Sequence, residues 1–361
     1  MHDWDVIVVG AGQAGCAAAW DLAAAGWRTL VLSRPAGHGK PCAGGITAKT
    51  LNRYRFSISP VIRESIDALT VSHFPGREKI LRAGRQFCVM TERAELDAYC
   101  ARQAEERGAS FATTRGLHTV TQNARGVTVA TREGHQFTAA TVIASDGAHS
   151  QVRKLLGESR HDGAVAIEGC VPCSELDHYP GMTLDFGAIA GGYGWLFPKG
   201  DHVNVGLYVW KSGAAATTRQ ALRHYSRQRL GVAPQTMVGY PLGTWLPRSR
   251  LMQGRVLFTG DAAGCTEVLL GEGIYGAVLS GQLAAQAVVS GVPDSYPSLM
   301  AAWKEELGTV CHLARLFYPL LPVSTRMLQG RLGGTLVEGF AAGLTLGQCK
   351  RRWRGASPKR S

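Results

Sequence analysis

The chain has 361 residues and a formal net charge of +12. This length exceeds one ordinary hydrophobic core and predicts two domains built from interleaved segments. The basic surplus is dispersed and no nucleic-acid module is visible, so we expect no nucleic-acid partner. No stretch reaches the roughly 18 uninterrupted apolar residues of a membrane-spanning helix. The first residues lead directly into a predicted strand and leave no room for a signal peptide, so we expect a cytoplasmic protein.

The first predicted unit is a strand, a glycine turn and a helix. The turn reads Gly10-Ala11-Gly12-Gln13-Ala14-Gly15 and follows an apolar strand at residues 5–9. In such a turn the first glycine permits the tight bend and the second lets the backbone approach a pyrophosphate. The third lets helix and strand pack closely. The unit therefore predicts dinucleotide binding by Gly10, Gly12, Ala14 and Gly15.

The second strand, residues 28–32, departs from the usual pattern at its end. It runs into Ser33-Arg34, where an acidic residue commonly binds the ribose hydroxyls. A serine offers fewer hydrogen bonds than a carboxylate, so we expect a weaker adenosine contact at Ser33 and Arg34.

The middle of the chain alternates strands with one helix. Residues 56–84 predict strands of a second sheet, and Thr91 is predicted to cap the helix that follows it. Residues 127–139 predict a hairpin that leads into a buried strand at 141–145. Residues 156–247 are rich in strands with Gly, Trp and Tyr between them, which is typical of a sheet that roofs a cavity.

Two buried strands run into glycine turns, Asp146-Gly147 and Gly260-Asp261, and Gly271-Glu272-Gly273-Ile274 then opens a helix. Together with the first turn, these segments resemble the FAD-binding pattern of the flavoprotein hydroxylase and reductase superfamily. The Asp261 carboxylate suits a polyol chain, and the first amides of the helix suit an electron-rich ring edge. The resemblance implies FAD contacts from Asp146, Gly147, Gly260, Asp261, Gly271, Gly273 and Ile274, with Arg93 reaching the cofactor from its helix.

The predicted fold class is therefore α/β: a Rossmann-type FAD-binding domain, a second antiparallel β-sheet substrate domain and a helical C-terminus. The FAD-binding domain is assigned to residues 1–55, 85–155 and 248–295. The substrate sheet takes 56–84 and 156–247, and the helical region with its basic tail takes 296–361. The nine cysteines are expected to be reduced. The single pair Cys170-x-x-Cys173 has no second pair, so no metal site is expected.

Two narrower motifs specify the family. Pro41-Cys42-Ala43-Gly44-Gly45 and Tyr193-Gly194-Trp195-Leu196-Phe197-Pro198-Lys199 resemble the geranylgeranyl reductase family. The resemblance runs from residue 5 to about 290. Its members are FAD enzymes that reduce isolated double bonds of prenyl chains in lipids, chlorophyll precursors or quinones. It implies that Cys42, Ala43 and Gly44 lie near the cofactor. Ala43 replaces the usual glycine, a small change that preserves the backbone unless a positive φ is required there.

Residues of these motifs are candidates for substrate contact and catalysis. Tyr193, Trp195 and Phe197 alternate along one strand and so face one side of a sheet. They predict either an apolar wall for an isoprenoid tail or ordinary strand packing. Cys42 either touches the substrate and flavin or is an inert buried thiol. Lys199 is expected to meet a phosphate or water.

The implied reaction is delivery of a hydride from reduced flavin to a prenyl double bond. An unactivated alkene is a poor hydride acceptor, so a proton source is also needed; Cys42, Tyr193 and the flavin itself are candidates. The electron donor is expected to be NADPH or a reduced ferredoxin-like protein. Two alternatives remain open at this stage: an FAD-dependent monooxygenase or halogenase acting on an aromatic or polyketide-like substrate, and a flavin-binding electron carrier.

A prenylated lipid substrate also suggests peripheral contact with the inner face of the membrane. The C-terminus carries Lys350-Arg351-Arg352-Trp353-Arg354 and then Lys359-Arg360, cations that favour an anionic surface. The apolar residues 316–321 are expected to insert shallowly beside them. The alternative is a solvated tail.

Overall fold

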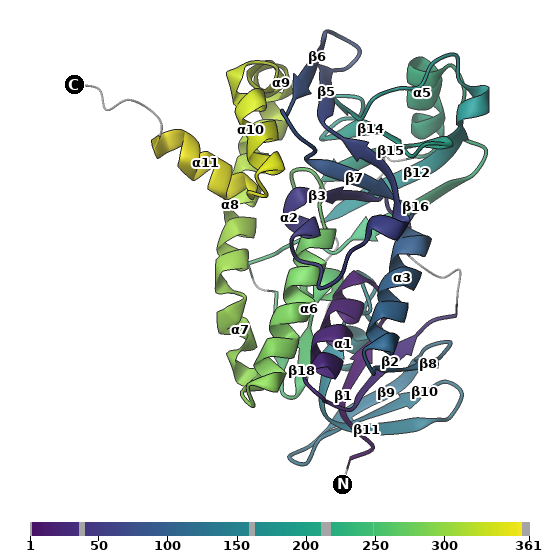
Figure 1. The fold of residues 1–361 in the computed structure, drawn as a ribbon, viewed down its shortest axis with the longest axis vertical. Coiled ribbons are helices and arrows are strands. Elements are labelled where there is room, and N and C mark those ends of the chain that lie inside the picture. Colours follow the sequence, from purple (N-terminus) through teal and green to yellow (C-terminus); the bar gives the residue numbers. More distant parts are fainter. Residues whose placement is uncertain (1, 36–39, 159–162, 211–217, 248, 356–361) are drawn as a thin grey trace.

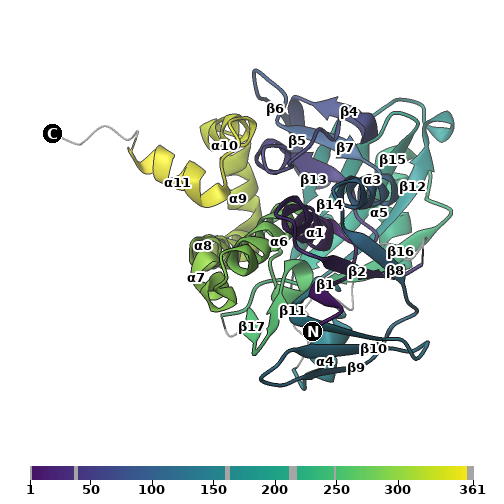
Figure 2. The same cartoon turned by 60° about the horizontal axis from the view of Figure 1, so that its bottom comes forward.

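The computed structural model describes residues 2–35, 40–158, 163–210, 218–247 and 249–355. Two large sheets and one small sheet form the fold, with the eight-stranded sheet at the lower end of Figure 1 and the seven-stranded sheet at the upper end. A layer of C-terminal helices runs along one side (Figures 1 and 2).

The eight-stranded sheet carries the first glycine turn. Its parallel part has the order β18-β11-β1-β2-β8, with β17 antiparallel at one edge and the strands β9 and β10 extending from β11. Strand β1 is buried because helices cover it, which explains its unbroken apolar run. The predicted hairpin is confirmed by the pairing of β10 with β11. The strands are β1 Trp4–Val9, β2 Thr29–Ser33, β8 Ser110–Thr113, β9 Leu117–Gln122, β10 Val127–Thr131, β11 Gln136–Ala144, β17 Met252–Gln253 and β18 Val256–Phe258.

Helices α1 (Gln13–Ala24) and α6 (Ile274–Val289) pack against each other, and α3 (Arg93–Glu106) packs against α1 (Figure 1). Both α1 and α6 begin at a predicted glycine segment, so their N-termini follow the two motifs directly. Two short helices, α2 (Ala48–Leu51) and α4 (Gln151–Leu155), complete this part. Thr91 does not cap α3, as the sequence suggested; the cap position is Glu92, and the Thr91 hydroxyl donates to the Gly44 carbonyl instead.

The seven-stranded sheet has the order β16-β12-β15-β14-β13-β5-β6, with only the β13–β5 pair parallel. Helix α5 (Arg219–Leu230) covers one face, and its residues Leu222 and Tyr225 join the core there. The opposite face carries the predicted aromatic row. The strands are β5 Ala68–His73, β6 Glu78–Arg82, β12 Ala164–Pro172, β13 Thr183–Phe186, β14 Gly192–Pro198, β15 His202–Trp210 and β16 Met237–Leu242.

A third sheet connects the other two. It has the order β3-β7-β4 and holds the glycines that follow Cys42 against the start of α3. Residues 56–84 therefore divide between two sheets, because β4 joins this small sheet whereas β5 and β6 join the large one. Its strands are β3 Gly45–Thr47, β4 Ile62–Ile66 and β7 Cys88–Thr91.

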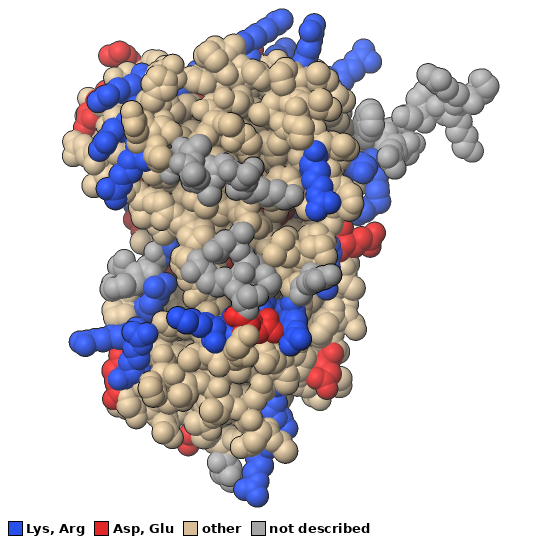
Figure 3. Space-filling view, turned by 180° about the vertical axis from the view of Figure 1, so that it is seen from behind, with Lys and Arg blue, Asp and Glu red and all other residues tan. Residues whose placement is uncertain are grey.

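The C-terminal region is helical, as predicted. Its helices are α7 Tyr296–Leu299, α8 Ala301–Phe317, α9 Leu321–Leu328, α10 Arg331–Ala341 and α11 Leu346–Gly355. Helix α11 projects from the side of the molecule (Figure 1). Within the described residues, no helix combines the length and apolarity needed to cross a bilayer. Figure 3 shows lysines and arginines spread over the visible face rather than gathered in one patch.

Candidate cofactor and substrate site

The three glycines of the first turn have two different roles. Gly10 and Gly15 are needed by the backbone itself, whereas Gly12 leaves space for a ligand. Gly10 has φ +103°, and a Cβ there would lie 2.5 Å from the Ser145 carbonyl oxygen. A Cβ on Gly15 would lie 1.8 Å from the Gly10 carbonyl oxygen. Both glycines are therefore required by the fold. Gly12 is different: its φ is −78°, and a Cβ there would meet nothing within 4 Å.

The open side of Gly12 lies at the N-terminus of α1, where no side chain caps the helix. The first amides of a helix without a cap are free donors with a positive dipole end, which suits a pyrophosphate. Ala14 is buried, and its methyl group lies against the Gly260 turn. The residues present thus fit the pyrophosphate of a dinucleotide.

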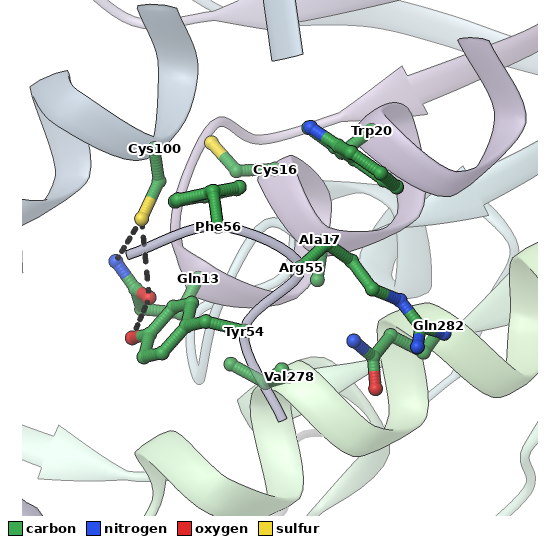
Figure 4. Close-up of a pocket in the computed structure, with 10 residues that line it drawn as sticks. All are labelled: Gln13, Cys16, Ala17, Trp20, Tyr54, Arg55, Phe56, Cys100, Val278 and Gln282. Atoms are coloured by element: carbon green, nitrogen blue, oxygen red, sulfur yellow. Dashed lines mark hydrogen bonds between the residues drawn. The ribbon is translucent and has the colours of Figure 1, made fainter. Parts of the chain in front are cut away.

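The Gln13 side chain turns away from this cradle. Its Nε2 donates to Asp97 Oδ1 at 2.6 Å, and its Oε1 accepts from the Tyr54 hydroxyl at 2.6 Å. Figure 4 shows Gln13 with Tyr54 and Cys100 at a narrow pocket beside α1. These bonds anchor the start of α1 while its backbone amides stay available.

The Gly260-Asp261 turn lies next to the start of α6. Asp261 Oδ1 accepts from the Thr266 hydroxyl at 2.8 Å, and Oδ2 pairs with Lys40 Nζ at 2.5 Å. Burial opposes ionisation of this carboxyl, but Lys40 outweighs it and lowers the pKa of Asp261. Asp261 is therefore held as a carboxylate, the state that accepts hydrogen bonds from a polyol.

The other residues predicted to contact the nucleotide differ in whether their polar groups are already hydrogen-bonded within the protein. The Asp146 carboxylate accepts from the Ser150 hydroxyl at 2.6 Å and from the Val152 amide at 3.0 Å, so it closes its own turn. Gly147 has φ +82° and open space at its Cβ position, which leaves its backbone approachable. Ser33 is half-buried at the end of β2, and Arg34 is exposed.

Strand β7 holds the P-C-A-G-G loop, residues 41–45, through hydrogen bonds. The Gly44 carbonyl accepts both the amide and the hydroxyl of Thr91, each at 2.9 Å. Gly44 has φ +77°, and a Cβ there would lie 1.9 Å from the Thr91 carbonyl oxygen, so this position requires glycine. Cys42 is half-buried and lies close enough to Arg93 to help raise the pKa of that side chain, and Arg93 also pairs with Asp97 at 2.9 Å. Arg93 therefore reaches the loop from its helix.

Lys199 does not meet a phosphate or water, contrary to the sequence expectation. Its side chain is 1% exposed, and Nζ pairs with Glu92 Oε1 at 2.5 Å, while His202 Nε2 bonds the same oxygen at 3.0 Å. Burial opposes ionisation of Glu92, but His202 and Lys199 outweigh it and lower the pKa of Glu92 to about 2. The cluster braces the end of β14 against the start of α3.

The cluster makes stability depend on pH. Hydrogen bonds to Cys170 and Glu92 raise the pKa of His202 from 6.5 to about 10. Protonated His202 therefore stabilises the fold fully below pH 6.5, and this contribution is lost as the pH rises toward 10. We therefore expect the free energy of unfolding, measured in urea, to decrease less for His202→Gln than for the parent as the pH rises from 6.5 to about 10. The exposed-site variant His118→Gln should follow the parent; equal pH dependence of all three proteins would refute the assignment.

The aromatic residues Tyr193, Trp195 and Phe197 share one face of β14, as predicted. Their ring centroids are 6.2 Å apart for the first pair and 6.3 Å for the second. A Cβ on Gly45 would lie 3.3 Å from Phe197 Cε2, so the row ends beside the P-C-A-G-G loop. Tyr193 donates its hydroxyl proton to the Leu270 carbonyl, and burial raises its pKa. That hydroxyl therefore holds the segment before α6.

Two further tyrosines hold the same segment. Tyr208 donates to the Val268 carbonyl at 2.8 Å, and Tyr318 donates to the Leu269 carbonyl at 2.6 Å. The buried Glu267 carboxylate accepts the amides of Leu269, Leu270 and Glu272, and burial raises the pKa of Glu267 to about 7. The tyrosine hydroxyls bind the carbonyls of residues 268–270, and Glu267 binds amides of the same segment. The backbone before Gly271, Gly273 and Ile274 is therefore fixed, which orients the first amides of α6.

Sequence reasoning missed an acidic residue on the substrate sheet. Glu168 on β12 is 5% exposed and accepts from the Tyr240 hydroxyl at 3.0 Å. Burial raises the pKa of Glu168, which favours the protonated acid. Glu168 lies two residues from Ala166 on its strand, and Ala166 belongs to the same core as Tyr193 and Trp195. The sequence did contain a signal for this residue, because Glu168 is the one charged residue in the otherwise apolar run of β12.

The comparisons with known proteins identify the class and then the family. The profile described as FAD binding domain matches residues 3–172. The chain is an FAD-dependent oxidoreductase. It is 30% identical over 342 residues to the chloroplastic geranylgeranyl diphosphate reductase of Oryza sativa subsp. japonica, covering 88% of this chain and 73% of that protein. It is 31% identical over 342 residues to the menaquinone reductase of Mycolicibacterium smegmatis, covering 87% and 82%. This chain belongs to the geranylgeranyl reductase family.

The fold agrees with that membership. A geranylgeranyl bacteriochlorophyll reductase-like protein of Thermoplasma acidophilum superposes with a TM-score of 0.79 at 22% identity, covering 99% of this chain and 97% of that protein. At this identity the likeness shows the fold alone.

Proposed function

We propose that the chain uses reduced FAD to saturate isolated double bonds of a prenyl chain on a lipid, quinone or pigment precursor. The observation that carries the proposal is the position of the aromatic row, which ends against Gly45 in the loop that follows Cys42. Large, rigid apolar side chains suit an isoprenoid tail. The names of the relatives, a geranylgeranyl diphosphate reductase and a menaquinone reductase, support a reductase of this kind.

In this proposal the FAD-binding segments 1–55, 85–155 and 248–295 hold the cofactor against the substrate sheet formed by 56–84 and 156–247. The amides after Gly12 bind the pyrophosphate, Asp261 binds the polyol, and the start of α6 meets the ring edge. Ser33 and Arg34 lie toward the adenosine. When bound, FAD supplies the hydride.

The proton source that the sequence left open is assigned here to Glu168. Its carboxyl is buried, its pKa is raised by burial, and the Tyr240 hydroxyl fixes its orientation. A protonated carboxyl can transfer its proton to one alkene carbon while the other carbon accepts the hydride, and Glu168 then regains a proton from solvent. Cys42 and Arg93 both interact electrostatically with Tyr240, so Glu168 and Tyr240 lie near the loop that carries Cys42.

The decisive experiment is anaerobic. The FAD-loaded protein is reduced and mixed with a geranylgeranylated lipid, and flavin reoxidation is followed together with the mass of the lipid. A reductase reoxidises its flavin without oxygen and adds two hydrogens for each double bond. A monooxygenase or halogenase needs oxygen, and an electron carrier leaves the lipid unchanged. Reduction of the flavin by NADPH or by a reduced ferredoxin-like protein, tested separately, identifies the electron donor.

Replacement of Cys42 tests the loop. We expect Cys42→Ser to retain FAD and to lower the rate of alkene reduction by roughly tenfold, or to change the number of double bonds reduced. The reason is that Cys42 is expected to orient the substrate relative to the flavin, and misorientation slows the reaction. Rates and product masses measure both effects. Cys88→Ser is the control, since Cys88 is buried and burial raises its pKa to about 12. If both variants match the parent, Cys42 is structural only.

We also propose peripheral contact with a membrane, because a prenylated lipid must be taken from the bilayer. Of the predicted basic tail, Lys350 and Arg351 lie on α11. The side chains of residues 352–355 and all of residues 356–361, including Lys359 and Arg360, lie outside the described part of the chain. Helices α8 and α9, which precede the tail, offer a second surface for membrane contact.

A further inference from the structure

Four large apolar side chains are exposed along the segment from the end of α8 to α9. They are Leu316 at 66%, Leu320 at 55%, Val323 at 59% and Met327 at 54% exposure. Leu316 lies on the last turn of α8, Leu320 ends the 3-10 turn Tyr318–Leu320, and Val323 and Met327 lie four residues apart on one side of α9. Tyr318 and Thr325, which lie between them in the sequence, are buried. We call these four residues the apolar stripe. Single exposed apolar residues are ordinary, but four that are close together in one segment mark an interaction surface.

The charged residues of the segment that carries the apolar stripe are of one sign. From residue 307 to residue 337 the sequence contains no Asp or Glu, yet it contains Arg315, Arg326 and Arg331. All three arginines are exposed. An apolar stripe with a cationic rim complements an anionic lipid surface, where apolar side chains enter the interface and arginines meet headgroup phosphates.

The inner side of the same segment covers the aromatic row. Phe317 and Phe186 have ring centroids 4.9 Å apart, and Phe186 and Tyr193 follow at 5.6 Å. From Tyr193 the row continues through Trp195 to Phe197 beside the Cys42 loop. The helical layer that contains α8 and α9 lies along the side of the molecule next to α6, the edge strand β6 and its neighbour β5 (Figures 1 and 2).

We propose that the apolar stripe docks on an anionic bilayer and that a prenyl chain passes from there along the aromatic row to the Cys42 loop. The second half of this inference rests on the proposed function, whereas the docking does not. The occupant is a lipid surface rather than a second copy of the chain, because the arginine rim of one copy would repel the same rim on another.

Binding of the full-length, FAD-loaded protein to vesicles tests the docking. We expect binding to vesicles with anionic lipid, weak binding to neutral vesicles and a steep decrease with salt. Val323→Ser/Met327→Ser should lower the partition coefficient by about tenfold or more, since polar hydroxyls replace inserted apolar groups. The matched control is Val289→Ser/Val292→Ser, whose parent residues are 41% and 54% exposed elsewhere on the surface.

The charge component has its own pair of variants. Arg315→Gln/Arg326→Gln/Arg331→Gln should lower anionic binding and flatten its salt dependence. Three exposed arginines of α5, replaced in Arg219→Gln/Arg223→Gln/Arg227→Gln, are the control. Parent-like affinity in both the stripe and the rim variants overturns the docking proposal. So does loss of binding only on removal of residues 352–361, which assigns the contact to the tail. A parent dimer that the stripe variant converts to monomer, with vesicle binding unchanged, assigns the stripe to a second copy.

A comparison of two substrates tests the route. The parent should reduce both a short, water-soluble prenyl diphosphate and a geranylgeranylated lipid in vesicles, and the stripe variant should lose only the second activity, by about tenfold. Equal activity of both proteins on the vesicle lipid overturns the route. No reduction of either substrate by the parent overturns the proposed function instead, while the vesicle measurements still decide the docking.

Discussion

Gly12→Val is expected to weaken FAD binding strongly while the protein remains folded. A Cβ at Gly12 meets no atom within 4 Å and its φ is −78°, so the substitution fits the backbone. In the proposed site the same side chain projects into the space assigned to the pyrophosphate. Loss of the pyrophosphate contacts should weaken FAD binding by about 10²-fold or more, roughly 3 kcal/mol. The flavin-to-protein absorbance ratio and a fluorescence titration with added FAD measure the effect.

Two comparisons separate cofactor binding from folding. Gly84→Val, at an exposed glycine that also has open space, should keep the parent's flavin content. Gly15→Val should fail to fold, because its Cβ would lie 1.8 Å from the Gly10 carbonyl oxygen. The circular dichroism spectrum of Gly12→Val should match that of the parent freed of FAD. Unchanged flavin content in Gly12→Val would contradict the assignment of this turn to the cofactor.

Glu168→Gln is expected to lower the rate of prenyl reduction by about 10²- to 10⁴-fold, the range of general acid catalysis. Glutamine preserves the shape and the bond from Tyr240 but has no acidic proton. FAD content and the rate of flavin reduction by the electron donor should stay at the parent's values. Single-turnover reoxidation of the reduced flavin by a prenyl lipid isolates the affected step.

The pH profile distinguishes an acid from a residue that only positions its neighbours. The parent's rate should fall as the pH rises through the pKa of Glu168, and Glu168→Gln should lack this fall. The Tyr240 hydrogen bond lowers the pKa of Glu168, so Tyr240→Phe should move the fall to higher pH. A Glu168→Gln enzyme with the parent's rate and profile would remove Glu168 from the mechanism.

Much of the fold and the class of cofactor follow from sequence because they depend on local backbone requirements. The apolar run of β1 reports burial on both faces, and Gly10 and Gly15 report a turn that no side chain can enter. Such requirements involve neighbouring residues or one tight contact, so they leave a pattern at fixed spacing. The alternation of Tyr193, Trp195 and Phe197 on one face follows from the period of a strand in the same way.

The tertiary structure decided the partners of the polar groups. Lys199 pairs with Glu92, 107 positions away, and not with a phosphate. Thr91 bonds Gly44 instead of capping α3, and Tyr208 and Tyr318 meet Tyr193 at one segment before α6. The sequence by itself determined where the chain must bend, where it must be buried and which cofactor it can cradle. Only the fold determined which side chains meet, because a hydrogen bond or ion pair requires two groups within a few ångströms, and distant pairs leave no spacing to read.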